Sequence, residues 1–171
     1  EAPRKETNSL RALIRKALAK EKGNAELLGG VTALPPHWKD HDGSRFLIWL
    51  RLPEAPLLTM NCKDYKLCVI ERSCFVTGLS AGEIRSLKGL TVDPLTGHLL
   101  LIHPERRNII QLEGKSCSAL RAKILITLPK NLPVASALMI DKARSLWLSH
   151  AGSEDATSAS AFSWPVAIWR P

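Results

Sequence analysis

The chain has 171 residues, of which 45% are apolar, and its formal net charge is +8. This length and composition indicate one globular domain and exclude a long disordered chain. No apolar run approaches the ~18 residues that a membrane-spanning helix needs, so the sequence predicts no transmembrane segment.

The N-terminal segment carries half of the net charge, because residues 1–23 contain seven basic and three acidic side chains. Apolar residues from Leu10 to Leu18 recur at helical spacing, and Gly29–Gly30 and Pro35–Pro36 are typical of a linker. We therefore expect residues 1–30 to form a basic helical arm and linker, and residues 31–171 to form the main domain.

The arm is a candidate partner-binding element that should add little apolar area to the domain. Deletion of residues 1–23 is therefore expected to leave the sheets folded. Its candidate partner contacts are Arg11, Arg15, Lys16 and Lys20. Such a basic face could bind protein, an anionic membrane surface or nucleic acid, but a solvated helix face carries the same charges.

Residues 37–42 bring two His and two Asp residues close together in the sequence, which is a combination that metals favour. Their neighbours Pro36, Trp38 and Gly43 indicate a surface loop, and the spacing aligns no ligands on a strand or helix. We therefore predict a loop here, and no metal site.

Three segments further along the chain repeat one pattern, in which an apolar strand closes on a polar residue and a turn leads into a second strand. The closing residues are Asn61, Asp93 and Asp141. Strands that stop at Leu-Pro, residues 48–53 and 124–129, precede the first and third copies. This pattern predicts three antiparallel meanders over residues 46–79, 87–128 and 134–170.

The four cysteines allow three pairings. Cys62 and Cys68 flank one predicted hairpin turn, and Cys68 and Cys74 flank the next, so Cys68 could bond to either neighbour. Zinc sites use closer cysteine pairs, and four free buried cysteines remain an alternative. Disulfides, together with a first residue that is Glu1 rather than Met, favour an exported protein that has lost a signal peptide, although a chain boundary would also explain Glu1.

Residues 90–99, Leu-Thr-Val-Asp-Pro-Leu-Thr-Gly-His-Leu, resemble the repeat of six-bladed β-propellers of the NHL, SMP-30/gluconolactonase and SdiA-regulated type. Residues 138–150 resemble a shorter variant, and the likeness extends over about residues 45–170. It implies a mainly β, propeller-like fold of about three blades with a short N-terminal helix. Relatives with lactonase activity hold a divalent metal with acidic residues, but the matching positions here are 56–57, 88–89 and 136–137, which carry no carboxylate. We therefore expect no cofactor and no catalytic residues.

The second strands of the three copies end at Glu71, His103 and His150, which would form one rim if the copies are equivalent. Polar strand ends that face solvent explain the same residues. Trp49 and Trp147 lie in apolar runs and are predicted core residues, whereas Trp164 and Trp169 near the C-terminus are candidate partner contacts.

These observations favour a non-enzymatic binding or scaffold subunit of a larger assembly, periplasmic or extracellular. Both ends of the series carry apolar residues, at 46–48 and at 166–169, so either a second copy or other proteins should cover them. A degenerate propeller hydrolase that uses the rim is one alternative. A basic subunit of an organellar ribonucleoprotein is another, although the strands lack the mixed basic and aromatic residues of nucleic-acid binders.

Overall fold

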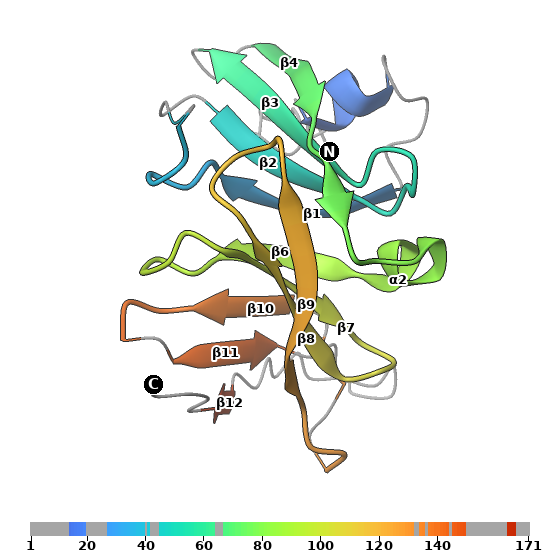
Figure 1. Cartoon of the computed structure of the whole chain (residues 1–171), viewed down its shortest axis with the longest axis vertical. Helices are drawn as coiled ribbons and strands as arrows, with labels where there is room; N and C mark the ends of the chain where they lie inside the picture. The colour runs from blue at the N-terminus through green and yellow to red at the C-terminus, as the bar shows by residue number, and fades with distance from the viewer. Residues whose placement is uncertain are drawn as a thin grey trace, which may run out of the picture.

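The computed structural model describes residues 14–19, 27–39, 41, 45–63, 67–131, 134–135, 137–143, 145–149 and 164–166. The fold is mainly β, with three sheets that follow one another along the long axis of the molecule (Figure 1). The predictions of a β-rich chain, antiparallel meanders and a short N-terminal helix are therefore confirmed. No helix in the described part of the chain is long and apolar enough to cross a membrane.

Sheet 1 contains four consecutive antiparallel strands, which are β1 (Leu28–Ala33), β2 (Arg45–Leu50), β3 (Leu57–Lys63) and β4 (Leu67–Ser73). The second strand is buried on both faces, which explains its nearly continuous apolar sequence. The prediction of a linker at Gly29–Gly30 is wrong, because both glycines belong to β1, and Gly30 pairs with Trp49 of β2.

Sheet 2 contains the antiparallel strands β6 (Lys88–Val92), β7 (Leu99–His103), β8 (Asn108–Glu113) and β9 (Leu120–Thr127). The two-residue strand β5 (Val76–Thr77) crosses over from sheet 1 and pairs in parallel with β9. The helix α2 (Ala81–Ser86) follows, and it begins at a capping box in which Ser80 and Glu83 each bond to the other's backbone. This short helix was not predicted from the sequence.

Sheet 3 is the smallest, with strands β10 (Ala137–Ile140), β11 (Leu146–Ser149) and β12 (Trp164–Val166). The strands are antiparallel, and Leu138, Leu146 and Leu148 are buried against sheet 2. The turn between β10 and β11 is held by Asp141, whose carboxylate accepts from the backbone N–H of Ser145 at 2.8 Å.

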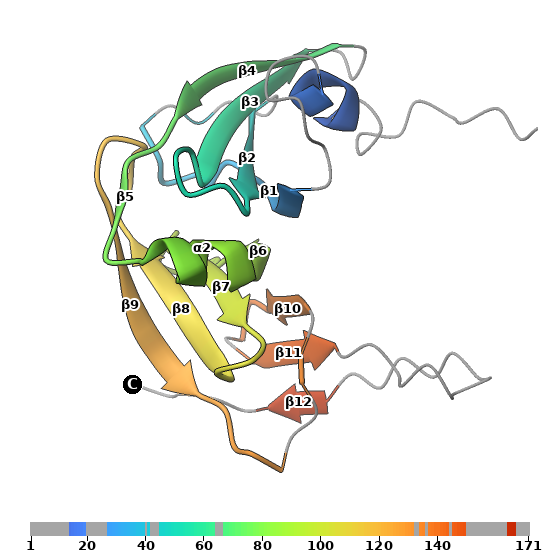
Figure 2. The same cartoon turned by 90° about the vertical axis from the view of Figure 1, so that its right-hand side faces the viewer.

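The three sheets pack through their first strands, since β6 lies beside β1 on one side and beside β10 on the other (Figure 2). Small residues permit this approach. A Cβ atom on Gly30 would lie 2.5 Å from the backbone N of Leu90, and one on Gly89 would lie 3.3 Å from the Cα of Ala137. Gly89 also has φ +73°, a conformation that side chains with a Cβ rarely adopt.

Two indole rings connect sheet 1 to sheet 2. Trp49 is fully buried in the core between the sheets, and its Nε1–H donates to the carbonyl of Leu87 at 3.1 Å. Trp38, in the loop after β1, donates in the same way to the carbonyl of Gly97 at 3.2 Å. Trp49 is thus a core residue as predicted, and these bonds place the turn after β6 relative to sheet 1. Trp147, the other predicted core residue, is only half-buried.

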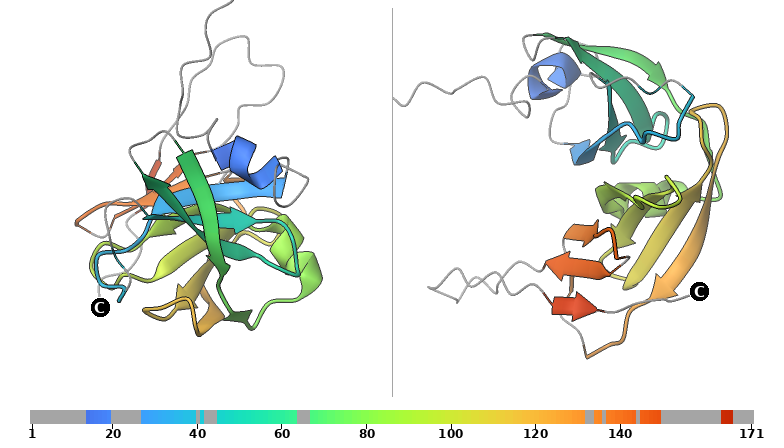
Figure 3. Two further views of the ribbon diagram at one scale, coloured as in Figure 1. Left: turned by 90° about the horizontal axis from the view of Figure 1, so that it is seen from above. Right: turned by 90° about the vertical axis from the view of Figure 1, so that its left-hand side faces the viewer.

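The N-terminal helix, residues 14–19, packs on the face of sheet 1 that points away from sheet 2 (Figure 3). Ile14 is 1% exposed and Leu18 is 0% exposed, and both belong to a core cluster with Ile48, Leu58 and Met60. The prediction that this segment adds little apolar area is therefore wrong. A single apolar stripe gave the position of the helix but did not show which surface it covers.

The alignment of the first repeat with the other two is also wrong. Asp93 and Asp141 follow the first strands of their sheets, β6 and β10, whereas Asn61 lies on β3, the third strand of sheet 1. The equivalent hairpin in sheet 1 is β1–β2, with a longer connection at residues 34–44. The predicted apolar edge at residues 46–48 is covered, because Leu47 and Ile48 are fully buried on opposite faces of β2.

Two disulfides link the described cysteines. Cys62 bonds to Cys68 across the β3–β4 hairpin, which is one of the two pairings that the sequence left open. The bond between Cys74 and Cys117 was not predicted, and it joins the crossover from sheet 1 to the β8–β9 connection of sheet 2. Backbone hydrogen bonds from Phe75 to Cys117 and from Leu120 to Phe75 flank this second disulfide.

Candidate functional site

The predicted rim of Glu71, His103 and His150 does not form from its described members. Glu71 lies on β4 of sheet 1, whereas His103 ends β7 of sheet 2, and His150 lies outside the described residues. Glu71 and His103 occupy different positions in their sheets. The repeat alignment that placed them at one rim had matched the first repeat to the wrong hairpin. The hypothesis of one shared Glu/His/His site therefore loses its geometric basis.

Glu71 takes part in an ion pair at the end of sheet 1. Its carboxylate accepts from Arg45 Nε at 2.9 Å and from Asn61 Nδ2 at 3.3 Å. Beside it lies a small cavity of about 200 Å³, which Leu34, Thr59 and Arg72 also line. The Thr59 hydroxyl is buried and has no hydrogen-bond partner among the described residues, and a water in this cavity would supply one.

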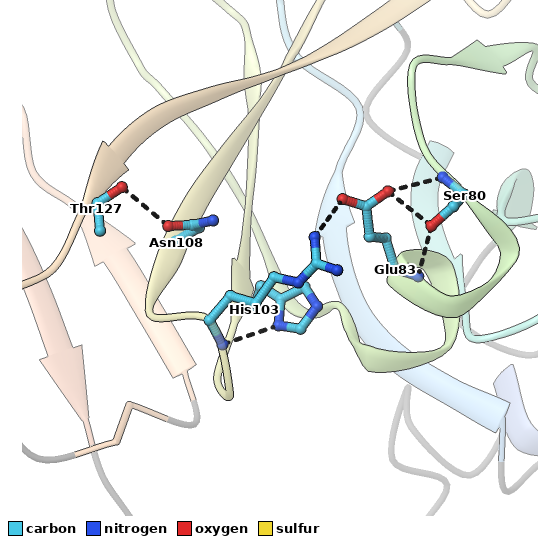
Figure 4. A network of polar contacts seen from close by, with 6 residues as sticks. Ser80, Glu83, His103, Asn108 and Thr127 are labelled. Atoms are coloured by element: carbon cyan, nitrogen blue, oxygen red, sulfur yellow. Dashed lines mark hydrogen bonds and ion pairs between the residues drawn. The ribbon is translucent and has the colours of Figure 1, made fainter.

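His103 is a buried residue with a structural role, not the solvent-facing strand end that was the alternative prediction. It is 4% exposed, and its Nδ1 accepts from the backbone N–H of Arg106 at 3.3 Å (Figure 4). The Arg106 guanidinium in turn bonds to Glu83 of α2 at 3.1 Å. His103 thus shapes the β7–β8 turn, which reaches α2 through Arg106.

Glu83 is the acidic centre of this network. Its carboxylate accepts from the backbone N–H and the hydroxyl of Ser80, each at 2.8 Å. These bonds, foremost the backbone one, lower the pKa of Glu83, and the charge of Arg106 adds to them. A carboxylate held in this way remains ionised and stabilises the start of α2, which is a structural function.

The partner contacts predicted from the sequence are only partly described. Arg15 and Lys16 are exposed on the N-terminal helix, whereas Arg11 and Lys20 lie outside the described residues. Trp164 begins β12 and pairs in register with Leu148, and Trp169 lies outside the described residues. Arg15 and Lys16 are thus displayed by a helix that is itself part of the fold.

An apolar surface that the sequence did not single out lies on sheet 3. Met139 is 56% exposed and pairs directly with Trp147 on the face of β10–β11 opposite to the core. The Trp147 Nε1–H donates to the Asp141 carboxylate at 3.0 Å, which fixes the indole and lowers the pKa of Asp141. The Met139–Trp147 face is therefore ordered, apolar and accessible among the described residues.

A cavity of about 300 Å³ lies between sheets 2 and 3. Its apolar wall comes from both sheets, with Leu100, Leu125 and Ile126 on sheet 2 and Ile140 and Leu146 on sheet 3. Its polar side comes from the β6–β7 turn and from β8 and β9, with Asp93, Thr96, His98, Gln111, Glu113 and Lys123. Its walls therefore combine aliphatic residues with several polar groups, as small-molecule pockets do.

The polar side of this cavity is organised by the Asp93 turn. The Asp93 carboxylate accepts from the Leu95 N–H at 3.0 Å and from the Thr96 hydroxyl at 2.8 Å, and the Thr96 hydroxyl accepts from the His98 N–H at 3.2 Å. The His98 ring is held against the cavity by a hydrogen bond between its Nδ1 and the Gln111 amide. The repeat motif thus positions a histidine that the sequence analysis passed over.

The mouth of the cavity carries an ion pair between Glu113 on β8 and Lys123 on β9. This contact lowers the pKa of Glu113, and the nearby charges of His98 and Arg121 act in the same direction. One sequence signal could have indicated this region. Gln111 is a polar residue within the apolar run Ile109–Leu112, and polar side chains are uncommon in a strand that is buried on both faces.

Comparison with known proteins adds no family assignment, because no protein-family model matches the sequence and a search of curated proteins finds no match.

Proposed function

We propose that this chain is a non-enzymatic, protein-binding module built as a partial β-propeller, with sheets 1, 2 and 3 as three successive blades. Three features support this proposal. Sheets 1 and 3 run as consecutive antiparallel strands, as does sheet 2 from β6 to β9; their first strands lie side by side; and Asp93 and Asp141 occupy the same place after those strands. The two disulfides favour an oxidising compartment, either the periplasm or the cell exterior.

The observation that carries the binding function is the Met139–Trp147 face of sheet 3. A blade has two faces, and each of them normally packs on a neighbour. The N-terminal helix covers the outer face of sheet 1, so a head-to-tail ring with a second copy would have to displace Ile14 and Leu18. Two copies can instead meet through their sheet 3 faces, because an isologous contact needs only one self-complementary patch.

The hydrolase alternative has less support, because Glu71 and His103 serve separate structural contacts on different sheets. The ribonucleoprotein alternative rested on the basic N-terminal segment, and the described part of that segment is docked on sheet 1. Neither alternative gains a site from the described residues.

Sedimentation of the purified, oxidised protein tests the proposal. The wild-type chain is expected to form a dimer at micromolar concentration, and Met139→Lys is expected to shift it to monomer, because a lysine charge would be buried in an apolar contact. Leu95→Lys is the matched control, since Leu95 is 65% exposed in the β6–β7 turn and lies outside this face. A wild-type monomer, or equal effects of both substitutions, would contradict an isologous contact at sheet 3.

A further inference from the structure

The small cavity on sheet 1 contains a buried hydroxyl that no described group satisfies. Thr59 on β3 is 2% exposed, and its Oγ1 has no hydrogen-bond partner among the described residues. Thr59 lines the cavity of about 200 Å³ that also borders Glu71. Because buried polar groups are nearly always hydrogen-bonded, this hydroxyl points to an occupant of the cavity as its partner.

The sheet register places an arginine directly beside this hydroxyl. Thr59 pairs with Arg72 of β4 and with Leu47 of β2, and directly paired side chains lie on the same face of a sheet. Leu47 belongs to the core cluster between sheets 1 and 2, so this row of side chains faces sheet 2. Arg72 is exposed and also lines the cavity. The cavity wall thus combines a buried hydroxyl with a guanidinium that reaches solvent.

The charges around the cavity favour an anion. The lining contains two guanidinium groups, those of Arg45 and Arg72, and one carboxylate, that of Glu71. The Glu71 oxygens accept from Arg45 Nε at 2.9 Å, from Arg45 Nη2 at 3.3 Å and from Asn61 Nδ2 at 3.3 Å. A cation would have to compete with these three donors for the carboxylate. The second guanidinium leaves the lining with a net positive charge.

We propose that this cavity binds a small tetrahedral oxyanion of the phosphate or sulfate class, held by the Arg72 guanidinium and the Thr59 hydroxyl. Both groups donate hydrogen bonds, and the five N–H donors of a guanidinium can serve more than one acceptor. The volume of about 200 Å³ lies below the ~300–1,000 Å³ range of pockets for larger ligands, so it suits a free ion. Because the site lies on sheet 1, this proposal does not depend on the proposed contact at sheet 3.

Titration calorimetry with inorganic phosphate tests the assignment. Sodium chloride keeps the ionic strength constant, because a chain of net charge +8 also attracts anions non-specifically. Phosphate is expected to bind saturably at a 1:1 ratio and sulfate to displace it, whereas glycerol 3-phosphate should bind more weakly because the cavity is small. Absence of saturable phosphate binding at millimolar concentration would overturn the site. Equal binding of glycerol 3-phosphate would overturn the assignment to a free ion.

Two substitutions separate an anion site from a hydroxyl that a water satisfies. Thr59→Val removes the hydroxyl and keeps a similar shape, and Arg72→Met removes the charge. Each is expected to weaken phosphate binding about tenfold, which is the effect of losing one charge-assisted hydrogen bond. The matched controls are Thr127→Val, whose exposed hydroxyl bonds to Asn108, and Arg121→Met, an exposed arginine outside the lining. Wild-type phosphate affinity in either cavity variant would overturn the proposal.

Thr59→Val also has a readout that needs no ligand. In phosphate-free buffer this variant should be at least as stable to urea as wild type, because it removes a buried hydroxyl that lacks a partner. Unchanged or increased stability together with weakened phosphate binding would support the site. A clear loss of stability without phosphate would show that the hydroxyl already has a partner in the folded chain, and this result would overturn the proposal.

Discussion

Leu18 gives the most direct test of the N-terminal helix as part of the fold. Its side chain is fully buried against Ile48, Leu58 and Met60 of sheet 1, although it lies in a helix of six described residues. Isolated helices of this length are unstable in water, so packing must hold the helix in place. Leu18→Ala removes most of the side chain that makes this contact.

The expected cost of Leu18→Ala is about 2–3 kcal/mol in the free energy of unfolding, because buried leucines lose ~2–5 kcal/mol on truncation and a short helix can partly resettle. Urea denaturation under non-reducing conditions measures it, with fluorescence of the buried Trp49 among the signals that follow sheet 1. Lys16→Ala is the control on the same helix, since Lys16 is exposed, and it should stay within ~0.5 kcal/mol of wild type. Equal stabilities of the two variants would refute the docking of this helix and restore the expectation that it is a dispensable arm.

Two further predictions concern pH and the disulfides. The pKa of Glu83 is lowered, so the stabilising effect of its carboxylate is present above the unfolded pKa of ~4.3 and is lost as pH falls through the folded pKa. The difference in unfolding free energy between wild type and Glu83→Gln should therefore be constant near neutral pH and shrink on acidification. A difference that widens on acidification would contradict this prediction. Replacing Cys74 and Cys117 by Ser should lower the free energy of unfolding by about 4 kcal/mol, against about 2 kcal/mol for Cys62 and Cys68. The reason is that the first pair closes a 43-residue separation and the second a 6-residue one. The reverse order in chemical denaturation would show that loop entropy does not dominate.

The strands were predictable because their signals are local. Apolar runs bounded by turn residues gave the positions of β6, β7, β10 and β11, and Asp93 and Asp141 marked the same point after two first strands. The same sequence pattern gave a wrong alignment at Asn61. Any antiparallel hairpin can have a polar residue at the end of its first strand, whether that hairpin is the first or the last of its sheet. A local pattern specifies a hairpin but not its place in the sheet order.

The failures concern contacts between distant parts of the chain. Gly29–Gly30 had the composition of a linker, yet these glycines lie in β1, where Leu90 of another sheet comes too close to Gly30 to leave room for a side chain. Cys117 was left unpaired in the prediction because its partner Cys74 becomes its neighbour only when the crossover brings β5 beside β9. His98 and Lys123 were missed for the same reason, since their partners Gln111 and Glu113 lie on another strand.

The two ends of the stack of sheets differ in how their outer faces are covered, and the proposed contact at sheet 3 follows from this difference. At sheet 1 the chain supplies its own cover, since Ile14 and Leu18 of the N-terminal helix pack on the outer face. At sheet 3 the described residues supply none for Met139, which is 56% exposed although its neighbour Leu138 is 8% exposed. A thioether side chain adapts well to varied apolar surfaces, which suits a contact that forms after folding. An interaction at sheet 3 would thus cover the outer face of that sheet, as the N-terminal helix already covers the outer face of sheet 1. Because the helix occupies sheet 1, a partner would not bind at that end in the same way.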